Sequence, residues 1–214
     1  MLTSGLSRRY TEFQKAIGFG LRALFVDHYD SFSFNLIELL KRSGVDVVEH
    51  IYWQSIDAFA ASSFDFVVLS PGPKHPRDAI KSLDLISKIK GKIPILGVCL
   101  GFQLILEAEG FEIMRVPAPH HGAKKSIILN PHAKLTKDLP GRISVATYNS
   151  LGIKSDKFRA KESNFVEVAT SEDGLVQAVE SKTGPIIAGL QFHPESFLSE
   201  YSTELIKNFM RQIL

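Results

Sequence analysis

Short apolar runs alternate, along the first half of the chain, with stretches in which apolar residues recur every three or four positions. The runs predict buried strands and the recurring positions predict amphipathic helices. The predicted strands span 21–26, 45–52, 64–69 and 93–98, and the predicted helices span 34–43, 79–90 and 100–109. This alternation of strands and helices is typical of an α/β fold with a largely parallel sheet.

The pattern changes after Gly110 to short strands and turns. Strands are predicted at 111–116, 126–129, 142–147, 166–170, 175–179 and 186–192, and a final helix at 202–214 carries its apolar residues at a helical spacing. We expect one domain over 21–214, an α/β fold with a mostly parallel central sheet flanked by helices. Residues 1–20 are expected to form an N-terminal extension outside the core, with a helical turn at 11–20.

Composition limits the partners and the cellular compartment that we expect for this domain. A chain of 214 residues with 44% hydrophobic content can bury one sizeable core. The net charge is only +2, and the basic residues are scattered, which argues against a nucleic-acid partner. No apolar run approaches the roughly 20 residues of a membrane span, and no signal peptide is evident. A single cysteine permits no internal disulfide and favours a reducing compartment, so we expect a cytoplasmic protein.

That cysteine stands in a pattern associated with catalysis. It lies at the centre of Gly97-Val98-Cys99-Leu100-Gly101, after a predicted strand and before a predicted helix. Gly-x-nucleophile-x-Gly at such a junction is typical of a nucleophile elbow, where the glycines avoid collisions in a tight turn. The first N–H groups of the helix favour a thiolate and can hold an oxyanion. A buried structural thiol is the alternative interpretation.

A second motif near the C-terminus supplies a base. His193-Pro194-Glu195 follows the predicted strand 186–192, and residues two apart in an extended segment face the same side. A carboxylate beside an imidazole selects its tautomer and stabilises the imidazolium. His-x-Glu alone is also common at a solvated strand end. Combined with the elbow, it predicts a Cys-His-Glu triad made by Cys99, His193 and Glu195.

These segments together resemble a known family. Gly97 to Gln103, with Ser70-Pro71-Gly72-Pro73 upstream and Phe192 to Ser196 downstream, resembles the class I (triad) glutamine amidotransferases. The segment from Val26 to Leu36 is similar to the opening of the small subunits of anthranilate synthase and of 4-amino-4-deoxychorismate synthase. The resemblance covers about 21–214, with four motifs in the family's order. It implies the class I glutamine amidotransferase fold for the domain.

The resemblance also implies roles for further residues. The N–H groups of Gly72 and Leu100 would form the oxyanion hole, although a mere tight turn is the alternative at Gly72. Gln103 and the backbone at Ser150 and Leu151 would hold the two ends of the glutamine substrate. No cofactor is expected. Zinc binding is rejected because the histidines at 120, 121, 132 and 193 lack a converging spacing.

A partner chain is the last expectation. A small amidotransferase with no synthase domain implies a separate chorismate-using synthase as partner. The sequence departs from the family at Lys74, Ala123 and Asn149, in loops near the expected partner face. Two other functions stay open: a stand-alone thiol hydrolase acting on γ-glutamyl or other peptides, and a non-catalytic regulatory subunit, against which the intact triad residues argue.

Overall fold

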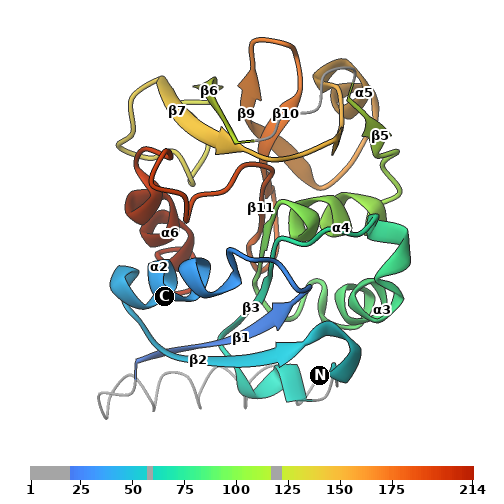
Figure 1. Cartoon of the computed structure of the whole chain (residues 1–214), viewed down its shortest axis with the longest axis vertical. Helices are drawn as coiled ribbons and strands as arrows, with labels where there is room; N and C mark the ends of the chain where they lie inside the picture. Colours follow the sequence, from blue (N-terminus) through green and yellow to red (C-terminus); the bar gives the residue numbers. More distant parts are fainter. Residues whose placement is uncertain (1–19, 57–59, 117–121) are drawn as a thin grey trace.

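The computed structural model describes residues 20–56, 60–116 and 122–214. In this part of the chain, one nine-stranded sheet runs in the order β2-β1-β3-β4-β11-β10-β9-β6-β7 (Figure 1). The α/β class predicted from the sequence is confirmed. The predicted N-terminal extension over 1–20, with its helical turn at 11–20, lies outside the described residues except for Gly20.

The sheet has a parallel and an antiparallel half. The parallel strands are β2 (Val45–Tyr52), β1 (Leu21–Asp27), β3 (Phe66–Leu69), β4 (Ile95–Val98) and β11 (Ile187–Leu190). The antiparallel strands are β10 (Val176–Ser181), β9 (Phe165–Ser171), β6 (Ala123–Leu129) and β7 (Arg142–Thr147). The central sheet is therefore mixed.

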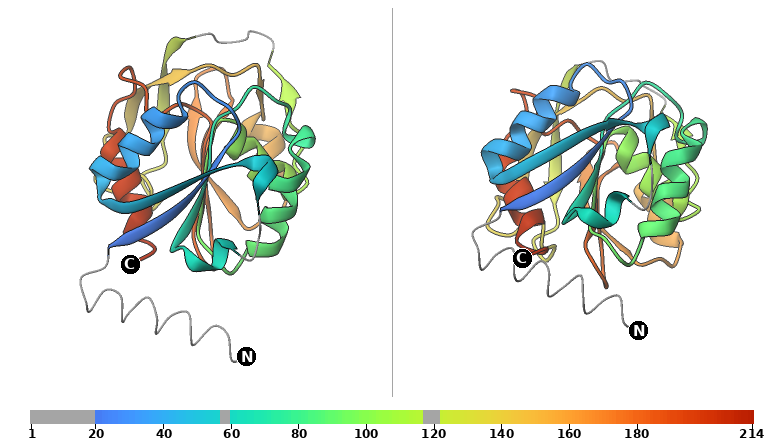
Figure 2. Two further views of the ribbon diagram at one scale, coloured as in Figure 1. Left: turned by 60° about the horizontal axis from the view of Figure 1, so that its bottom comes forward. Right: turned by 90° about the horizontal axis from the view of Figure 1, so that it is seen from below.

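Four helices cover the two faces of the parallel half. Helices α2 (Ser33–Ser43) and α6 (Ser202–Met210) lie on one face, and α3 (Ile80–Ile89) and α4 (Leu100–Ala108) on the other (Figures 1 and 2). Because successive side chains of a strand point to opposite faces, Phe25 packs in the core under α2 and α6, whereas Leu24 packs in the core under α3 and α4. Burial on both faces explains the continuous apolar runs of β1, β3, β4 and β11.

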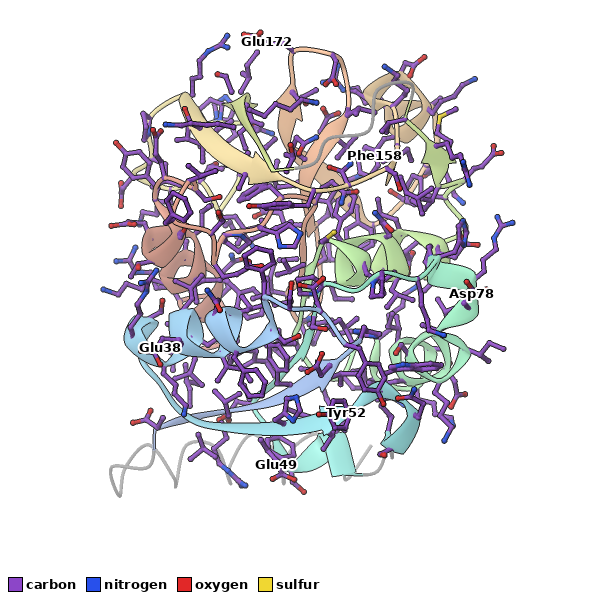
Figure 3. The ribbon with its side chains drawn as sticks, viewed as in Figure 1. Glu38, Glu49, Tyr52, Asp78, Phe158 and Glu172 are labelled. Atoms are coloured by element: carbon purple, nitrogen blue, oxygen red, sulfur yellow. The ribbon has the colours of Figure 1, made fainter. Side chains whose placement is uncertain are left out.

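Several short elements were not predicted from the sequence. They are α5 (Ser155–Ala160), β8 (Leu151–Gly152), and 3₁₀ turns at Trp53–Ser55, Ala60–Ser63 and Pro76–Asp78. Only two residues of α5 are buried, so it has no apolar repeat to detect. One of them, Phe158, stacks on Phe111 with ring centroids 5.0 Å apart and is labelled in Figure 3. The predicted strand 111–116 shrinks to β5 (Met114–Arg115), which pairs with β8.

The parallel strands bring the predicted chemistry to one edge of the sheet. The carboxyl ends of β1, β3, β4 and β11 lead to the segments that begin at His28, Ser70, Cys99 and Gln191. In open parallel sheets, ligands bind at this edge. The fold thus places all four motifs of the family resemblance near one another.

Candidate active site

The junction between β4 and α4 is a sharp elbow at Cys99. Its backbone has φ 52° and ψ −100°, a conformation that residues with a side chain rarely adopt. A Cβ on Gly97 would lie 2.4 Å from the carbonyl oxygen of Gly101, and one on Gly101 would lie 2.2 Å from that of Leu69. Both glycines are therefore required by the close approach of backbone to backbone. The predicted elbow is present.

Cys99 is held at the start of α4 from two sides. Its N–H donates to the carbonyl of Leu190 in β11 over 2.8 Å, and its own carbonyl accepts the N–H of Gln103 over 3.1 Å. As N-cap residue it sits where the helix dipole stabilises negative charge. Its side chain is buried but not sealed, with 8% of the residue exposed.

His193 and Glu195 form a buried pair beside this elbow. Nδ1 of His193 lies 2.6 Å from Oε1 of Glu195, which leaves Nε2 for the hydrogen bond to the Cys99 side chain. Burial favours a lower pKa for His193, but its hydrogen bonds to Cys99 and Glu195, and their charges, outweigh burial and raise the pKa well above its ordinary value. The three predicted triad residues are in one place.

The route to this pairing differs from the sequence prediction. We expected His193 and Glu195 to share one face of an extended segment. Instead β11 ends at Leu190, and the pair lies in a turn in which the N–H of Ser196 donates to the carbonyl of His193. Pro194 suits this turn because its fixed φ stops the strand from continuing.

Two aromatic rings enclose the imidazole. Phe32 and Tyr148 meet the ring of His193 edge-on, with centroids 5.6 and 4.9 Å away, and they also contact each other. Such packing limits the rotation of a histidine that must stay aligned with its partners. Sequence reasoning did not single out these two residues, although Phe32 lies within the opening motif from Val26 to Leu36.

Gly72 and Leu100 lie side by side, as an oxyanion hole requires. A Cβ on Gly72 would come within 2.7 Å of the Leu100 side chain and 2.6 Å of Cβ of His28. Among the described residues, no acceptor is assigned to the N–H of Gly72 or to that of Leu100. Two neighbouring backbone donors without an internal acceptor can bind a developing oxyanion.

The predicted glutamine-binding residues meet only in part. Nε2 of Gln103, one helical turn after Cys99, donates to the carbonyl of Leu151 over 3.4 Å and to Oε1 of Gln191 over 3.2 Å. Asn149 donates to the same carbonyl over 2.8 Å. Ser150 is exposed, and its carbonyl accepts the N–H of Val116. Sequence reasoning missed Gln191, which the two-residue alternation before His193 could have indicated.

A second buried histidine lies below the Gly72 loop. His28 is 1% exposed, with Nδ1 3.2 Å from Oγ of Ser70 and Nε2 2.9 Å from Oγ of Ser82. Burial lowers the pKa of His28 to about 4, although the charge of Asp27 and a hydrogen bond to the backbone of Ser70 oppose this change. The folded protein therefore holds the ring neutral at physiological pH.

This burial gives a testable pH dependence. The unfolded chain protonates His28 near 6.5 and the folded chain near 4, so within this window the unfolded state binds more protons and stability falls as the pH falls. The loss amounts to about 2 kcal/mol of the free energy of unfolding by pH 5. Urea unfolding of wild type and His28→Asn at pH 7, 6 and 5 measures it. Equal pH dependence in the two proteins would contradict it.

A metal site would require several ligand side chains close together. In the described ranges, no three His, Cys, Asp or Glu side chains gather in this way. The histidines at 120 and 121, part of the sequence argument on zinc, lie outside those ranges. None of the helices in the described part of the chain is long and apolar enough to cross a bilayer.

Comparison with known proteins adds independent information. The family model described as glutamine amidotransferase class-I matches residues 24–213. The aminodeoxychorismate/anthranilate synthase component 2 of Bacillus subtilis is 36% identical over 87% of this chain and 94% of its own length. The aminodeoxychorismate synthase component 2 of Escherichia coli is 35% identical over 88% and 99%, respectively. A crystal structure from Thermoplasma acidophilum, provisionally named as part of a GMP synthase, matches with a TM-score of 0.78 and 26% identity over 91% of this chain and 94% of that one.

Proposed function

The chain belongs to the class-I glutamine amidotransferase family, and from this membership and the site geometry we propose that it hydrolyses glutamine and supplies the ammonia to a chorismate-using synthase. The observation that carries the proposal is the convergence of Cys99, His193 and Glu195 at the elbow. We further propose that residues 21–214 are the amidotransferase domain, that it acts in the cytoplasm, and that it uses no cofactor and no nucleic acid.

Covalent catalysis follows from the arrangement of the triad. His193, oriented by Glu195, takes the proton of the Cys99 thiol, and the thiolate attacks the side-chain amide carbon of glutamine. The oxyanion is held by the N–H groups of Gly72 and Leu100. The protonated imidazole gives its proton to the leaving ammonia. Water, activated by the same imidazole, then releases glutamate from the γ-glutamyl thioester.

The substrate is held by groups on two loops and a helix. We propose that Gln103 and the backbone at Ser150 and Leu151 bind the α-amino and α-carboxylate ends of glutamine. Gln103 and Leu151 already touch, which supports a shared pocket. Gln191 and Asn149 extend the set, since each is buried and keeps one amide atom without a partner within the described residues. Unpaired buried amide atoms suit a site that binds a polar ligand.

A separate synthase is favoured by the chemistry of the product. Ammonia that reaches bulk water is protonated and loses its nucleophilic lone pair, so it has to pass directly between two sites. The relatives from Bacillus subtilis and Escherichia coli are called component 2, a name that implies a further component. Phe197, two residues beyond Glu195, is 93% exposed, and the loop that carries it is fixed by hydrogen bonds of Ser199 to Ala146 and His193. An apolar ring on a fixed loop beside the triad suits a docking contact.

An assay of glutamine turnover tests the proposal. We expect slow hydrolysis by the isolated chain and faster hydrolysis after addition of a chorismate-using synthase and chorismate. Chorismate and glutamine should also tighten each other's binding to the complex by the same factor, because coupling between binding affinities is reciprocal. The large subunits of an anthranilate synthase and of an aminodeoxychorismate synthase should be tried separately. A stand-alone thiol hydrolase would instead act fully by itself. Partner-independent hydrolysis of γ-glutamyl peptides, with glutamine ignored, would refute the amidotransferase function.

A further inference from the structure

The loop that carries Gly72 is held by buried polar side chains that the proposed reaction does not use. Ser70 follows β3, His28 follows β1 and Ser82 belongs to α3, and all three are at most 1% exposed. His28 also packs directly under Gly72, where a Cβ would collide with it. Buried hydroxyls and an imidazole at this point need a reason beyond packing.

The protons in this cluster can be assigned by counting donors. The single hydroxyl proton of Ser70 goes to the carbonyl of Pro71 over 2.6 Å, while the same oxygen accepts the backbone N–H of His28 over 2.8 Å. Because that proton is used, Nδ1 of His28 must be the donor in its 3.2 Å contact with Ser70. A neutral ring then has a bare Nε2, which accepts the hydroxyl proton of Ser82 over 2.9 Å.

The hydrogen bonds therefore run in one direction, from Ser82 through His28 and Ser70 to the Pro71 carbonyl. That carbonyl belongs to the same planar peptide group as the N–H of Gly72. In a trans peptide the two groups point to opposite sides, so holding the oxygen also aims the N–H. Hydrogen bonds in a directed chain polarise one another, and a donor on the oxygen strengthens the N–H as a donor.

We propose that Ser82, His28 and Ser70 form a directed hydrogen-bond chain that positions and polarises the Gly72 N–H for the oxyanion, with His28 in its Nδ1–H tautomer as the central positioning residue. The proposal rests on the proposed function, because it assigns a task to residues behind the oxyanion hole of that reaction. It predicts that turnover depends on the donor at Nδ1 and on the Ser70 hydroxyl more than on Ser82.

Paired substitutions separate the two ring nitrogens. Asparagine at 28 can place an amide N–H near Nδ1 and glutamine can place one near Nε2, so His28→Asn should keep kcat within about threefold of wild type. Ser70→Ala and His28→Gln should lower kcat for L-glutamine about 10-fold with little change in KM. This loss is smaller than the roughly 10²- to 10³-fold loss of kcat expected when an oxyanion donor is removed completely. Ser82→Ala should lower it less. Ser43→Ala, which removes a buried hydroxyl bonded to Leu39 in α2, is the matched control and should not lower it.

A second readout excludes a merely structural effect. Alkylation of Cys99 by iodoacetamide is a direct displacement that builds no oxyanion, so its rate should stay within twofold of wild type in every variant. All assays use the full chain, with the synthase present for kcat. Wild-type kcat in Ser70→Ala, or parallel losses of kcat and of the alkylation rate, would overturn the proposed hydrogen-bond chain. If Ser70→Ala does not fold, equal kcat in the two His28 variants overturns it. A wild type that hydrolyses no glutamine would instead refute the proposed function.

Discussion

Replacement of Cys99 by alanine should abolish glutamine-dependent synthesis by the complex and leave ammonia-dependent synthesis intact. In the proposed mechanism the Cys99 thiolate forms the γ-glutamyl intermediate, so its loss should lower the glutamine-dependent rate by about four orders of magnitude or more. In the proposed complex the synthase site lies on another chain, so ammonium salt at high pH should support product formation within about twofold of wild type. Product is measured by its fluorescence or by chromatography, with chorismate and either nitrogen source.

Chemical labelling tests the same residue without a partner. An electrophilic glutamine analogue should modify the wild-type chain once, at Cys99, as read by peptide mass spectrometry. The sequence contains no other cysteine, so a second thiol cannot account for the label. Undiminished labelling in Cys99→Ser would remove Cys99 as the nucleophile, and loss of ammonia-dependent synthesis in Cys99→Ala would point to damage to the complex.

The sequence was most informative where local patterns determine the structure. Strands buried on both faces gave continuous apolar runs, so β1, β3 and β4 were predicted close to their bounds. The elbow was predicted because Gly97 and Gly101 stand on either side of Cys99 in the sequence. The contact that requires Gly97 is made nearby, by the carbonyl of Gly101, whereas the contact that requires Gly101 is made by the more distant carbonyl of Leu69. Strand direction was less accessible: nothing in a short apolar run says that β10, β9, β6 and β7 are antiparallel, and the sheet is mixed.

The rest of the site depends on contacts between distant residues. Phe32, Tyr148 and His193 come together from three separate loops, and His28 contacts Ser82, which lies 54 residues further along the chain. No periodicity or short motif encodes such a meeting. The prediction placed His193 and Glu195 on an extended segment instead of in a turn, because an apolar run cannot show that β11 ends at Leu190.

The largest expected difference in kcat is that between substitutions of His193 and of Glu195, the two members of the buried pair. In the proposed mechanism His193 is the base for both chemical steps, and because a triad acts as a unit, its loss in His193→Ala should cost nearly as much as that of Cys99. Glu195→Gln keeps a side chain of the same shape that can still accept a hydrogen bond from Nδ1. It loses the negative charge that stabilises the imidazolium, so the effect on kcat should be about 10- to 100-fold milder than that of His193→Ala.

The charge of Glu195 can also be followed directly. Its hydrogen bond and charge help to raise the pKa of His193, so Glu195→Gln should lower that pKa in an NMR titration of ring-labelled histidine. Glu200→Gln is the matched control, since Glu200 lies in the same loop and pairs with Lys124 and the N–H of Ser144. It should change neither turnover nor the His193 titration. Wild-type glutamine turnover in His193→Ala, measured with the synthase present, would remove the general-base role, and an unshifted titration in Glu195→Gln would show that the 2.6 Å contact does not tune the imidazole.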